Sequence, residues 1–370
     1  MLLAVVAACT AVQEPVADLQ LEETPTISPD YTDVTIPATI APLRFRMLND
    51  SAEAVAVIAS EAGRWVVEAQ KGRFLLSEKE WKKVVGQSAG KEVQVTVMVR
   101  QKEQWAAYRP FTWHVSTDEI DPYLVYRLVE PGYELWNKMG IYERRLSSYD
   151  ERALLVNTQF DRNCMNCHSF NQRNPSQLLF HMREKRSGTY FVCDGEVKRI
   201  SGKFSERIKS LAYPYWHPSG RYVAFSTNTT RQAFHRGDAN RVEVFDRASD
   251  VLVYDRERDE VLTDSALASL AAFETFPTFS PDGKTLYFCS ADTCSMPAEF
   301  QKVKYSLCSI GFDADNRRFL SPVDTLYAST SGGKSASFPR VSPDGRYLVY
   351  TLSSYGNFSI WHKDADLYLL

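Results

Sequence analysis

Apolar and polar residues alternate along much of the first third of the chain, with the period of two that is typical of strands with one buried face. Six segments show this alternation: 31–36, 43–47, 54–58, 65–69, 92–98 and 111–115. Residues 77–85 are instead predicted to form a short helix. So many short strands predict an immunoglobulin-like β-sandwich over residues 31–120, although the Cys-Trp-Cys core signature of that fold is absent.

The second half of the chain contains a repeated pattern. Segments 213–225, 276–288 and 338–350 each begin with an aromatic residue and Pro, pass through a turn that ends in Gly, and continue into an aromatic-rich strand. The turn glycines are Gly220, Gly283 and Gly345, which are 63 and 62 residues apart. In such turns Pro presets φ and Gly supplies a positive φ. A strand, a tight turn and a second strand at a fixed period are typical of a β-propeller blade.

The repeated segments resemble the TolB-type, WD-repeat-like propeller family, whose blades open on aromatic-Pro-x-aromatic-Ser-Pro-Asp-Gly. The first copy departs from this pattern at His217 and Ser219. The resemblance covers residues 176–370 and implies propeller blades there. The period exceeds the usual blade length of about 40 to 45 residues, so inserted loops are expected, with 229–247 and 291–302 as candidates.

About three and a half blades are visible, whereas a closed propeller has about four to eight. The propeller is therefore predicted to be incomplete, with further blades in a longer parent protein. Residues 121–160 are predicted to be a connector with a short helix at 133–139. The predicted fold is mainly β, in four parts: a signal and flexible tether (1–30), a β-sandwich (31–120), a connector with a cysteine motif (121–175) and propeller blades (176–370).

The cysteine motif carries the strongest chemical signal. Cys164, Cys167 and His168 form C-x-x-C-H, the attachment sequence of a c-type haem. The two thiols form thioethers with the porphyrin vinyl groups, and the histidine becomes the proximal iron ligand. A thioredoxin-like pair needs a βαβ context and a zinc site needs a second pair of ligands, and the sequence offers neither. We therefore predict one covalently bound haem c.

A six-coordinate haem needs a second axial ligand. Met182 and His181 are the nearest candidates, and both lie in a predicted strand. Adjacent strand residues point to opposite faces, so at most one of the two is expected to serve. His217 and Met139 are candidates if the fold brings them near, and an open sixth position is the remaining alternative.

The N-terminus predicts export. Residues 1–9 are a short apolar run that ends in Cys9. The tetrapeptide Val-Ala-Ala-Cys at 6–9 resembles the bacterial lipobox, which implies a lipid on Cys9 and anchoring to the inner or outer membrane. Ordinary secretion and an accidental apolar start stay open. Because no Lys or Arg precedes the run, the alternatives are a true start upstream and an unusual signal. Because c-type haem is attached outside the bacterial cytoplasm, both features predict a periplasmic or outer-membrane lipoprotein.

The net charge and the remaining cysteines bear on the class of partner and on disulfide pairing. A net charge of -3 with scattered acids and bases disfavours nucleic acid as a partner. Cys193, Cys289, Cys294 and Cys308 allow three disulfide pairings in an oxidising compartment. Cys289 can meet Cys308 if their segments are neighbouring strands, and buried free thiols are the alternative.

Three functions are consistent with these features. The leading hypothesis is one-electron transfer between the haem and a partner protein. The second is a propeller scaffold that recognises a protein or glycan, with the haem as a sensor or structural element. The third is an enzyme with peroxidase-like chemistry at a five-coordinate haem. Propellers host many functions, so the fold does not choose among them.

Overall fold

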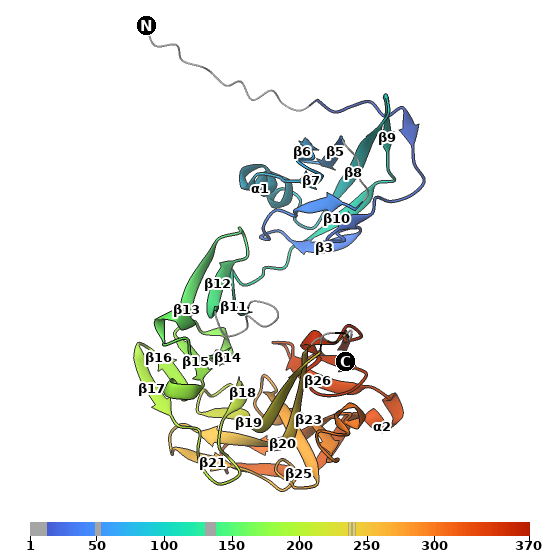
Figure 1. Cartoon of the computed structure of the whole chain (residues 1–370). Coiled ribbons are helices and arrows are strands. Elements are labelled where there is room, and N and C mark those ends of the chain that lie inside the picture. Colours follow the sequence, from blue (N-terminus) through green and yellow to red (C-terminus); the bar gives the residue numbers. More distant parts are fainter. Residues whose placement is uncertain (1–12, 49–52, 130–137, 236, 238–239, 241) are drawn as a thin grey trace. The chain divides into compact units, whose positions relative to one another are not determined.

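The computed structural model describes residues 13–48, 53–129, 138–235, 237, 240 and 242–370. Its regular structure is mainly β, as predicted, in seven sheets. The chain divides into two compact units, residues 1–126 with 142–154, and residues 127–141 with 155–370. In Figure 1 the colours follow the chain from blue at the N-terminus to red at the C-terminus.

The first unit contains a seven-stranded sheet and a three-stranded sheet. The larger sheet has the order β1-β9-β8-β10-β3, and β5 pairs with both β8 and β6. The smaller has the order β2-β4-β7. Their strands are β1 (Leu19–Gln20), β2 (Ile27–Ser28), β3 (Val34–Pro37), β4 (Phe45–Met47), β5 (Ala54–Ser60), β6 (Gly63–Glu68), β7 (Arg73–Phe74), β8 (Glu92–Gln101), β9 (Gln104–Ala107) and β10 (Phe111–Ser116). All six predicted strands are therefore confirmed, and both sheets contribute to one hydrophobic core.

The predicted helix is also confirmed, as α1 (Glu78–Gly86). Ser77 caps it, because its hydroxyl accepts the backbone N–H of Glu80 while the Glu80 carboxylate accepts the N–H of Ser77. Trp81 lies in the core between the sheets and contacts Trp113 at a ring-centroid distance of 5.6 Å. The helix therefore contributes to the same core as the two sheets.

Part of the predicted tether is ordered on this unit. β1 pairs with β9, and Ile27 in β2 is only 4% exposed. Asp18 also accepts the backbone N–H of Trp105 at 2.8 Å. A buried isoleucine and strand pairing explain why this segment does not behave as a free linker. Cys9 lies outside the described residues, and no helix in the described part of the chain is long and apolar enough to cross a membrane.

The predicted connector contains a three-stranded sheet. Its order is β11-β12-β13, and its strands are β11 (Tyr123–Val129), β12 (Met139–Arg145) and β13 (Glu151–Val156). The helix expected at 133–139 falls almost entirely outside the described residues, and Met139 begins a strand. Three strands thus lie in the segment that the sequence predicted to be a connector with a short helix.

The second unit consists of four successive antiparallel sheets. Three have four strands and the last has three, and in each sheet the strands pair in chain order. The strands are β14 (Met165–Phe170), β15 (Gln177–Met182), β16 (Gly188–Cys193), β17 (Glu196–Ile200), β18 (Ala212–Trp216), β19 (Tyr222–Phe234), β20 (Val242–Asp255), β21 (Glu260–Leu262), β22 (Ala272–Phe279), β23 (Thr285–Asp292), β24 (Ser306–Asp313), β25 (Arg318–Tyr327), β26 (Ser335–Val341), β27 (Leu348–Ser353) and β28 (Asp366–Leu369). The three repeated segments form the first two strands of the second, third and fourth sheets.

Neighbouring sheets pack face to face through separate hydrophobic cores. One core joins the first and second sheets around Trp216, another joins the second and third around Phe288, and a third joins the third and fourth around Tyr305. The first strands β14, β18, β22 and β26 contact one another in that order. In Figure 1 the last strands β17, β21 and β25 lie at the periphery of the unit.

The insertion predicted at 229–247 is a β-arm rather than a loop. β19 and β20 extend well beyond their sheet and pair with each other from Thr230 with Asp246 to Phe234 with Val242. Strand pairing satisfies the backbone polar groups that a long loop would leave to water. The arm reaches the loop between β27 and β28 of the fourth sheet, where Asn357 Nδ2 donates to the Asp246 carboxylate. By contrast, segment 291–302 is mainly irregular, as expected.

The cysteines that the structure describes are all free thiols. Cys289 and Cys308 do lie on neighbouring strands, but Cys289 is opposite Leu307 and Cys308 is opposite Phe288. Residues in adjacent register pairs point to opposite faces of a sheet. The two thiols accordingly belong to different hydrophobic cores, which prevents the disulfide considered from the sequence.

Candidate functional site

The C-x-x-C-H motif lies on the first strand of the first sheet. Cys164 immediately precedes β14. Sequence analysis assigned this segment to the connector. Asn166 is opposite His181 on β15, and the next register pair joins Ser169 and Leu179. Cys167 and His168 therefore share a single partner position, which makes a β-bulge. The motif belongs to a sheet of the second unit and is held by its ladder.

The same bulge occurs in each of the other first strands. The register shifts between Ala212 and Tyr215 in β18, between Thr275 and Thr278 in β22, and between Ser337 and Arg340 in β26. The residue that begins each bulge has a positive φ: Cys167 (52°), Tyr213 (49°), Phe276 (55°) and Phe338 (52°). Cys167 and His168 thus occupy the positions of the aromatic residue and Pro in the repeat.

The turn after β14 has the same backbone hydrogen bond as the turns of the other repeats, although its residues differ. The N–H of Asn174 donates to the carbonyl of Asn171 at 2.8 Å, as the N–H of Gly283 does to Ser280 at 2.9 Å. Sequence comparison missed this fourth copy because both the aromatic-Pro pair and the turn glycine are replaced. The remaining signal was Phe170, which matches the second aromatic position of the repeat.

Cys164 is enclosed by neighbours on β14 and β15. Its side chain is 3% exposed, and Asn166 Nδ2 donates to its Sγ at 3.6 Å. Burial raises the pKa of the Cys164 thiol, while the positive charges of Arg183 and Arg127 act in the opposite direction. The Oδ1 atom of Asn166 is buried without a hydrogen-bond partner. Cys167 and His168 are more accessible, because both are only partly buried.

The structure brings one histidine candidate next to the motif. His181 is directly opposite Asn166, so the two side chains share a face of the sheet. Alternation along β14 places Cys164 on that face too, in agreement with its contact to Asn166. His181 Nδ1 lies 3.2 Å from Thr189 Oγ1, and burial lowers the pKa of His181 to about 4, which keeps the imidazole neutral.

Two methionines, Met182 and Met139, also lie near the motif. Met182 is directly opposite Met165, and both are fully buried. Met139 is also buried, and its Sδ accepts the backbone N–H of Met165 at 3.4 Å. Met182 therefore lies on the opposite face of the strand from Cys164, whereas Met139 contacts the backbone of β14.

The structure gives His217 a different role. Its Nε2 donates to the carbonyl of Gly283 at 3.1 Å, while Nδ1 accepts the N–H of Ser219. Burial lowers the pKa of His217, so the ring is neutral in this setting. Both ring nitrogens are occupied by turn contacts. His217 thus links the turns of the second and third sheets and does not join the motif.

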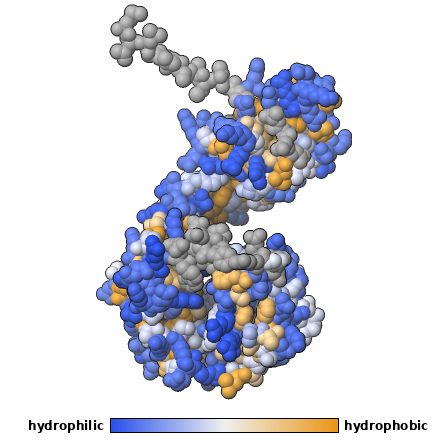
Figure 2. All heavy atoms as spheres, viewed as in Figure 1, coloured by the Kyte–Doolittle hydropathy of each residue, from blue (hydrophilic) through white to orange (hydrophobic). Residues whose placement is uncertain are grey.

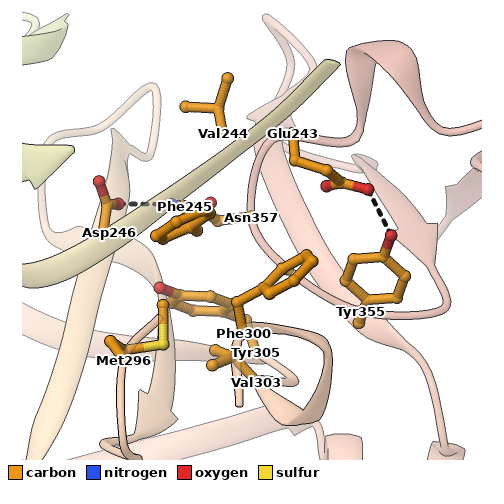
Figure 3. Close-up of a pocket in the computed structure, with 11 residues that line it drawn as sticks. Glu243, Val244, Phe245, Asp246, Met296, Phe300, Val303, Tyr305, Tyr355 and Asn357 are labelled. Atoms are coloured by element: carbon orange, nitrogen blue, oxygen red, sulfur yellow. Dashed lines mark hydrogen bonds between the residues drawn. The ribbon is translucent and has the colours of Figure 1, made fainter. Parts of the chain in front are cut away.

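A separate small pocket, which sequence analysis missed, is lined by residues of β20, of segment 296–305 and of the loop after β27. Figure 3 shows Tyr355 hydrogen-bonded to Glu243 and Asn357 hydrogen-bonded to Asp246. His362 Nε2 also contacts the Glu243 carboxylate at 3.1 Å. Burial raises the pKa of Asp246, although its hydrogen bonds act against this. Glu243 and Asp246 belong to no motif that could identify this contact from the sequence.

The residues at the motif suit covalent haem attachment. Both thiols are free. In a regular strand Cys164 and Cys167, which are three residues apart, would point to opposite faces, but the bulge at Cys167 breaks this alternation. His168 supplies an imidazole beside them, and His181 supplies a second, neutral one nearby. The orphaned Asn166 oxygen is a further polar group without a partner in the protein. Among the described residues, no group of three or more His, Cys, Asp or Glu side chains is placed to hold a metal ion.

The surface around these sites is mixed in character. Figure 2 shows hydrophilic and hydrophobic residues interspersed over the visible face of the second unit, with hydrophobic residues gathered in small groups. The exposed large apolar side chains of this unit include Leu367 and Leu369 on β28. Scattered apolar residues of this kind are normal on a protein surface and identify no site by themselves.

No family model matches the chain, and no curated protein matches it. Solved structures give distant likenesses. An ancestral GH74 enzyme has a TM-score of 0.34 and 11% identity, with 89% of this chain and 40% of that chain covered. A DUF4784 family protein from Bacteroides caccae has a TM-score of 0.32 and 8% identity, with 93% and 95% covered. Oligogalacturonate lyase in complex with manganese has a TM-score of 0.31 and 11% identity, with 75% and 61% covered.

The chain spans less than two thirds of the lyase and GH74 chains that it resembles. Likeness at these TM-scores carries no argument about function.

Proposed function

We propose that this protein is an exported c-type haem protein that transfers single electrons to or from a partner protein. The observation that carries the proposal is the C-x-x-C-H motif, placed on a strand with two free thiols and a partly exposed histidine. Cys164 and Cys167 would form the thioethers, and His168 would be the proximal iron ligand. The bound haem would supply one-electron chemistry at its iron.

The architecture proposed around this site is a propeller of the TolB type. Four antiparallel sheets follow one another, their first strands are neighbours, and a hydrophobic core fills each space between sheets. Radial repetition of four-stranded sheets is what defines a propeller. For the first unit, two sheets around one core support the proposal of an immunoglobulin-like sandwich.

His181 is better supported than Met182 as the second axial ligand. It shares a face with Cys164, whereas Met182 lies on the other face. The contact between His181 Nδ1 and Thr189 orients the ring and leaves Nε2 for a metal, which is how ligand histidines are usually fixed. The chain's contribution to the potential would come from this ligand, from burial and from hydrogen bonds to His168.

The proposed location is the bacterial cell envelope, with a lipid on Cys9 as the anchor. The lipobox-like tetrapeptide and the compartment in which c-type haem is attached support it. The partner would be a redox protein of the same compartment. Nucleic acid is not proposed as a partner, because the net charge is -3.

Spectroelectrochemistry of the full chain, produced with the periplasmic haem-attachment machinery, tests this function. We expect a reversible one-electron couple and a low-spin, six-coordinate spectrum. Cys193→Ala is the matched control for the Cys164→Ala/Cys167→Ala variant, because Cys193 is also a free thiol of the same sheet and is partly buried. An attached haem without a reversible couple would contradict electron transfer.

The second axial ligand has its own test. His181→Ala should convert the spectrum to a high-spin form, whereas Met182→Leu should leave it low-spin, because only His181 shares the face of Cys164. A low-spin His181→Ala protein together with a high-spin Met182→Leu protein would assign the ligand to methionine. Magnetic circular dichroism distinguishes these states directly.

A second candidate function is recognition of a protein or glycan by the repeated sheets of the second unit. In that case the haem would be a sensor or a structural element. A change in the haem spectrum on addition of a ligand, with no reversible electron exchange with any redox protein, would favour this function.

A further inference from the structure

Three of the four first strands place an aromatic ring at the start of the bulge. The ring centroids of Tyr213 and Phe276 are 4.5 Å apart, and those of Phe276 and Phe338 are 4.2 Å apart. Tyr213 and Phe338 are 6.4 Å apart. Because every one of these residues has the same left-handed backbone conformation, the three rings converge on one cluster. We call it the axial aromatic cluster.

Cys167 occupies the fourth equivalent position. It begins the same bulge, with a φ of 52°, on the strand next to that of Tyr213. The repeat therefore directs the Cys167 side chain toward the place where the other strands direct their rings. A thiol is much smaller than a phenyl ring, so the protein alone supplies less apolar surface at this position than at the other three.

Tyr213 is the cluster member closest to the motif in the order of strands. β14 and β18 are neighbours, and Trp216 Nε1 donates to the carbonyl of Ser169 at 3.2 Å across them. Burial raises the pKa of Tyr213, with smaller contributions in the same direction from the charges of Asp246 and Cys167. Tyr213 thus lies between Cys167 and Phe276.

We infer that the porphyrin ring, once attached at Cys167, packs against Tyr213 and takes the fourth place in the axial aromatic cluster. This inference rests on the proposed haem attachment and names the surface that positions the haem. A covalent thioether limits how far the macrocycle can lie from Cys167. A flat apolar ring placed there is expected to bury its face on the nearest aromatic side chain. Tyr213 is then a positioning residue.

The test uses fluorine NMR of the full-length holoprotein in the ferrous state, labelled with 3-fluorotyrosine. The reference is the haem-free Cys164→Ala/Cys167→Ala protein, and Tyr213→Phe assigns the Tyr213 resonance among the 19 tyrosines. We expect the ring current of the haem to shift the Tyr213 resonance strongly. Tyr350 in the fourth sheet should keep its position and serves as the internal control.

A second measurement separates a haem contact from a purely structural role. Tyr213→Leu and Phe338→Leu remove rings at equivalent positions of the same cluster. Both should lower stability to a similar degree, but only Tyr213→Leu should change the haem midpoint potential and absorption spectrum, and Tyr213→Phe should restore both.

The outcomes distinguish this inference from the function on which it rests. Haem attached with an unshifted Tyr213 resonance, or with equal spectral changes for both leucine variants, would overturn the packing on Tyr213 and leave the haem protein intact. A protein that binds no haem despite competent attachment machinery would overturn the inference together with the proposed function.

Discussion

The first strand of the first sheet and the first strand of the third sheet have nearly the same backbone and very different side chains. Both carry a bulge that begins with a residue of positive φ, 52° at Cys167 and 55° at Phe276. In β22 the bulge holds Phe-Pro, which packs into a core, whereas in β14 it holds Cys-His. The backbone of the repeat is therefore compatible with two uses of the same position, one for packing and one for chemistry.

This difference shows how a structural repeat can accept a cofactor site. Proline at the second bulge position has no N–H to donate and a fixed φ, so the bulge suits it. Histidine at the same position leaves the ladder intact, because the bulge already lies outside regular pairing. The motif can thus be added to a strand without rebuilding the sheet around it.

The strongest change should come from giving β14 the residues of the other strands. In the variant Cys167→Phe/His168→Pro, covalent haem should be lost completely, because a thioether and the proximal ligand are removed. The fold should survive, since an aromatic residue and Pro occupy these positions in β18, β22 and β26. We expect a free energy of unfolding within about 1 kcal/mol of the parent haem-free protein. Absorbance of the denatured protein and chemical denaturation measure both quantities.

The control for that variant is Cys164→Ala/Cys167→Ala, which also lacks haem but leaves the rest of the strand unchanged. If the Phe-Pro variant unfolds or aggregates while the alanine variant is stable, β14 is not equivalent to the other first strands. That result would remove the basis of the comparison.

A smaller effect on stability is expected from alanine substitutions at two turn glycines of the repeat. Gly283 and Gly345 share a φ of +74°, but a Cβ at Gly283 would overlap His217 Nε2, whereas at Gly345 its nearest neighbours lie 3.9 Å away. Gly345→Ala should cost about 1 kcal/mol from backbone strain alone. Gly283→Ala should cost about 3 kcal/mol, because the His217 hydrogen bond is also lost. Urea denaturation of both variants gives the comparison, and equal losses would show that His217 does not link the sheets.

A still smaller effect concerns Glu274, which occupies in β22 the position held by Met165, Leu211 and Ala336 in the other repeats. Glu274 is 2% exposed and its Oε2 has no hydrogen-bond partner. Burial raises its pKa to about 7, with a further contribution from Asp250, while the Ser269 hydroxyl and Arg207 act in the opposite direction. Because the folded pKa lies above that of the unfolded chain, stability is lost as the pH rises from about 4.3 to about 7.

Glu274→Gln removes this dependence. The variant should be more stable than the parent by about 2 kcal/mol at pH 8, with a much smaller difference at pH 4. Thermal unfolding at the two pH values measures the effect. A gain of the same size at both pH values would show that titration of Glu274 is not its cause.

Sequence reasoning found those parts of the fold in which local pattern and tertiary environment agree. The strands of the first unit and α1 follow from alternation and from a helical segment, and the turns at Gly220, Gly283 and Gly345 follow from backbone rules. It missed the arm of β19 and β20, because polar strands that pair mainly with each other have no apolar alternation. The ordered part of the predicted tether was also missed, since two-residue strands are too short to show a period.

The candidate site was found as a motif but not as a place in the fold. Cys164, Cys167 and His168 were identified by their spacing alone, and the face that His181 shares with Cys164 required the register of β14 and β15. The fourth copy of the repeat was hidden because the motif replaces the very residues by which the other copies are recognised. The register between two strands depends on both partners, so it cannot be predicted from either segment alone.

If β14 is a repeat strand that holds a haem, the cofactor must be bonded to Cys164 and Cys167. Mass spectrometry of the digested protein, produced with competent haem-attachment machinery, examines those two sulfur atoms directly. We expect the peptide containing Cys164 and Cys167 to carry the mass of one haem, bound through both sulfur atoms. The same peptide recovered with two free thiols, or with a disulfide between them, would contradict haem attachment on this strand.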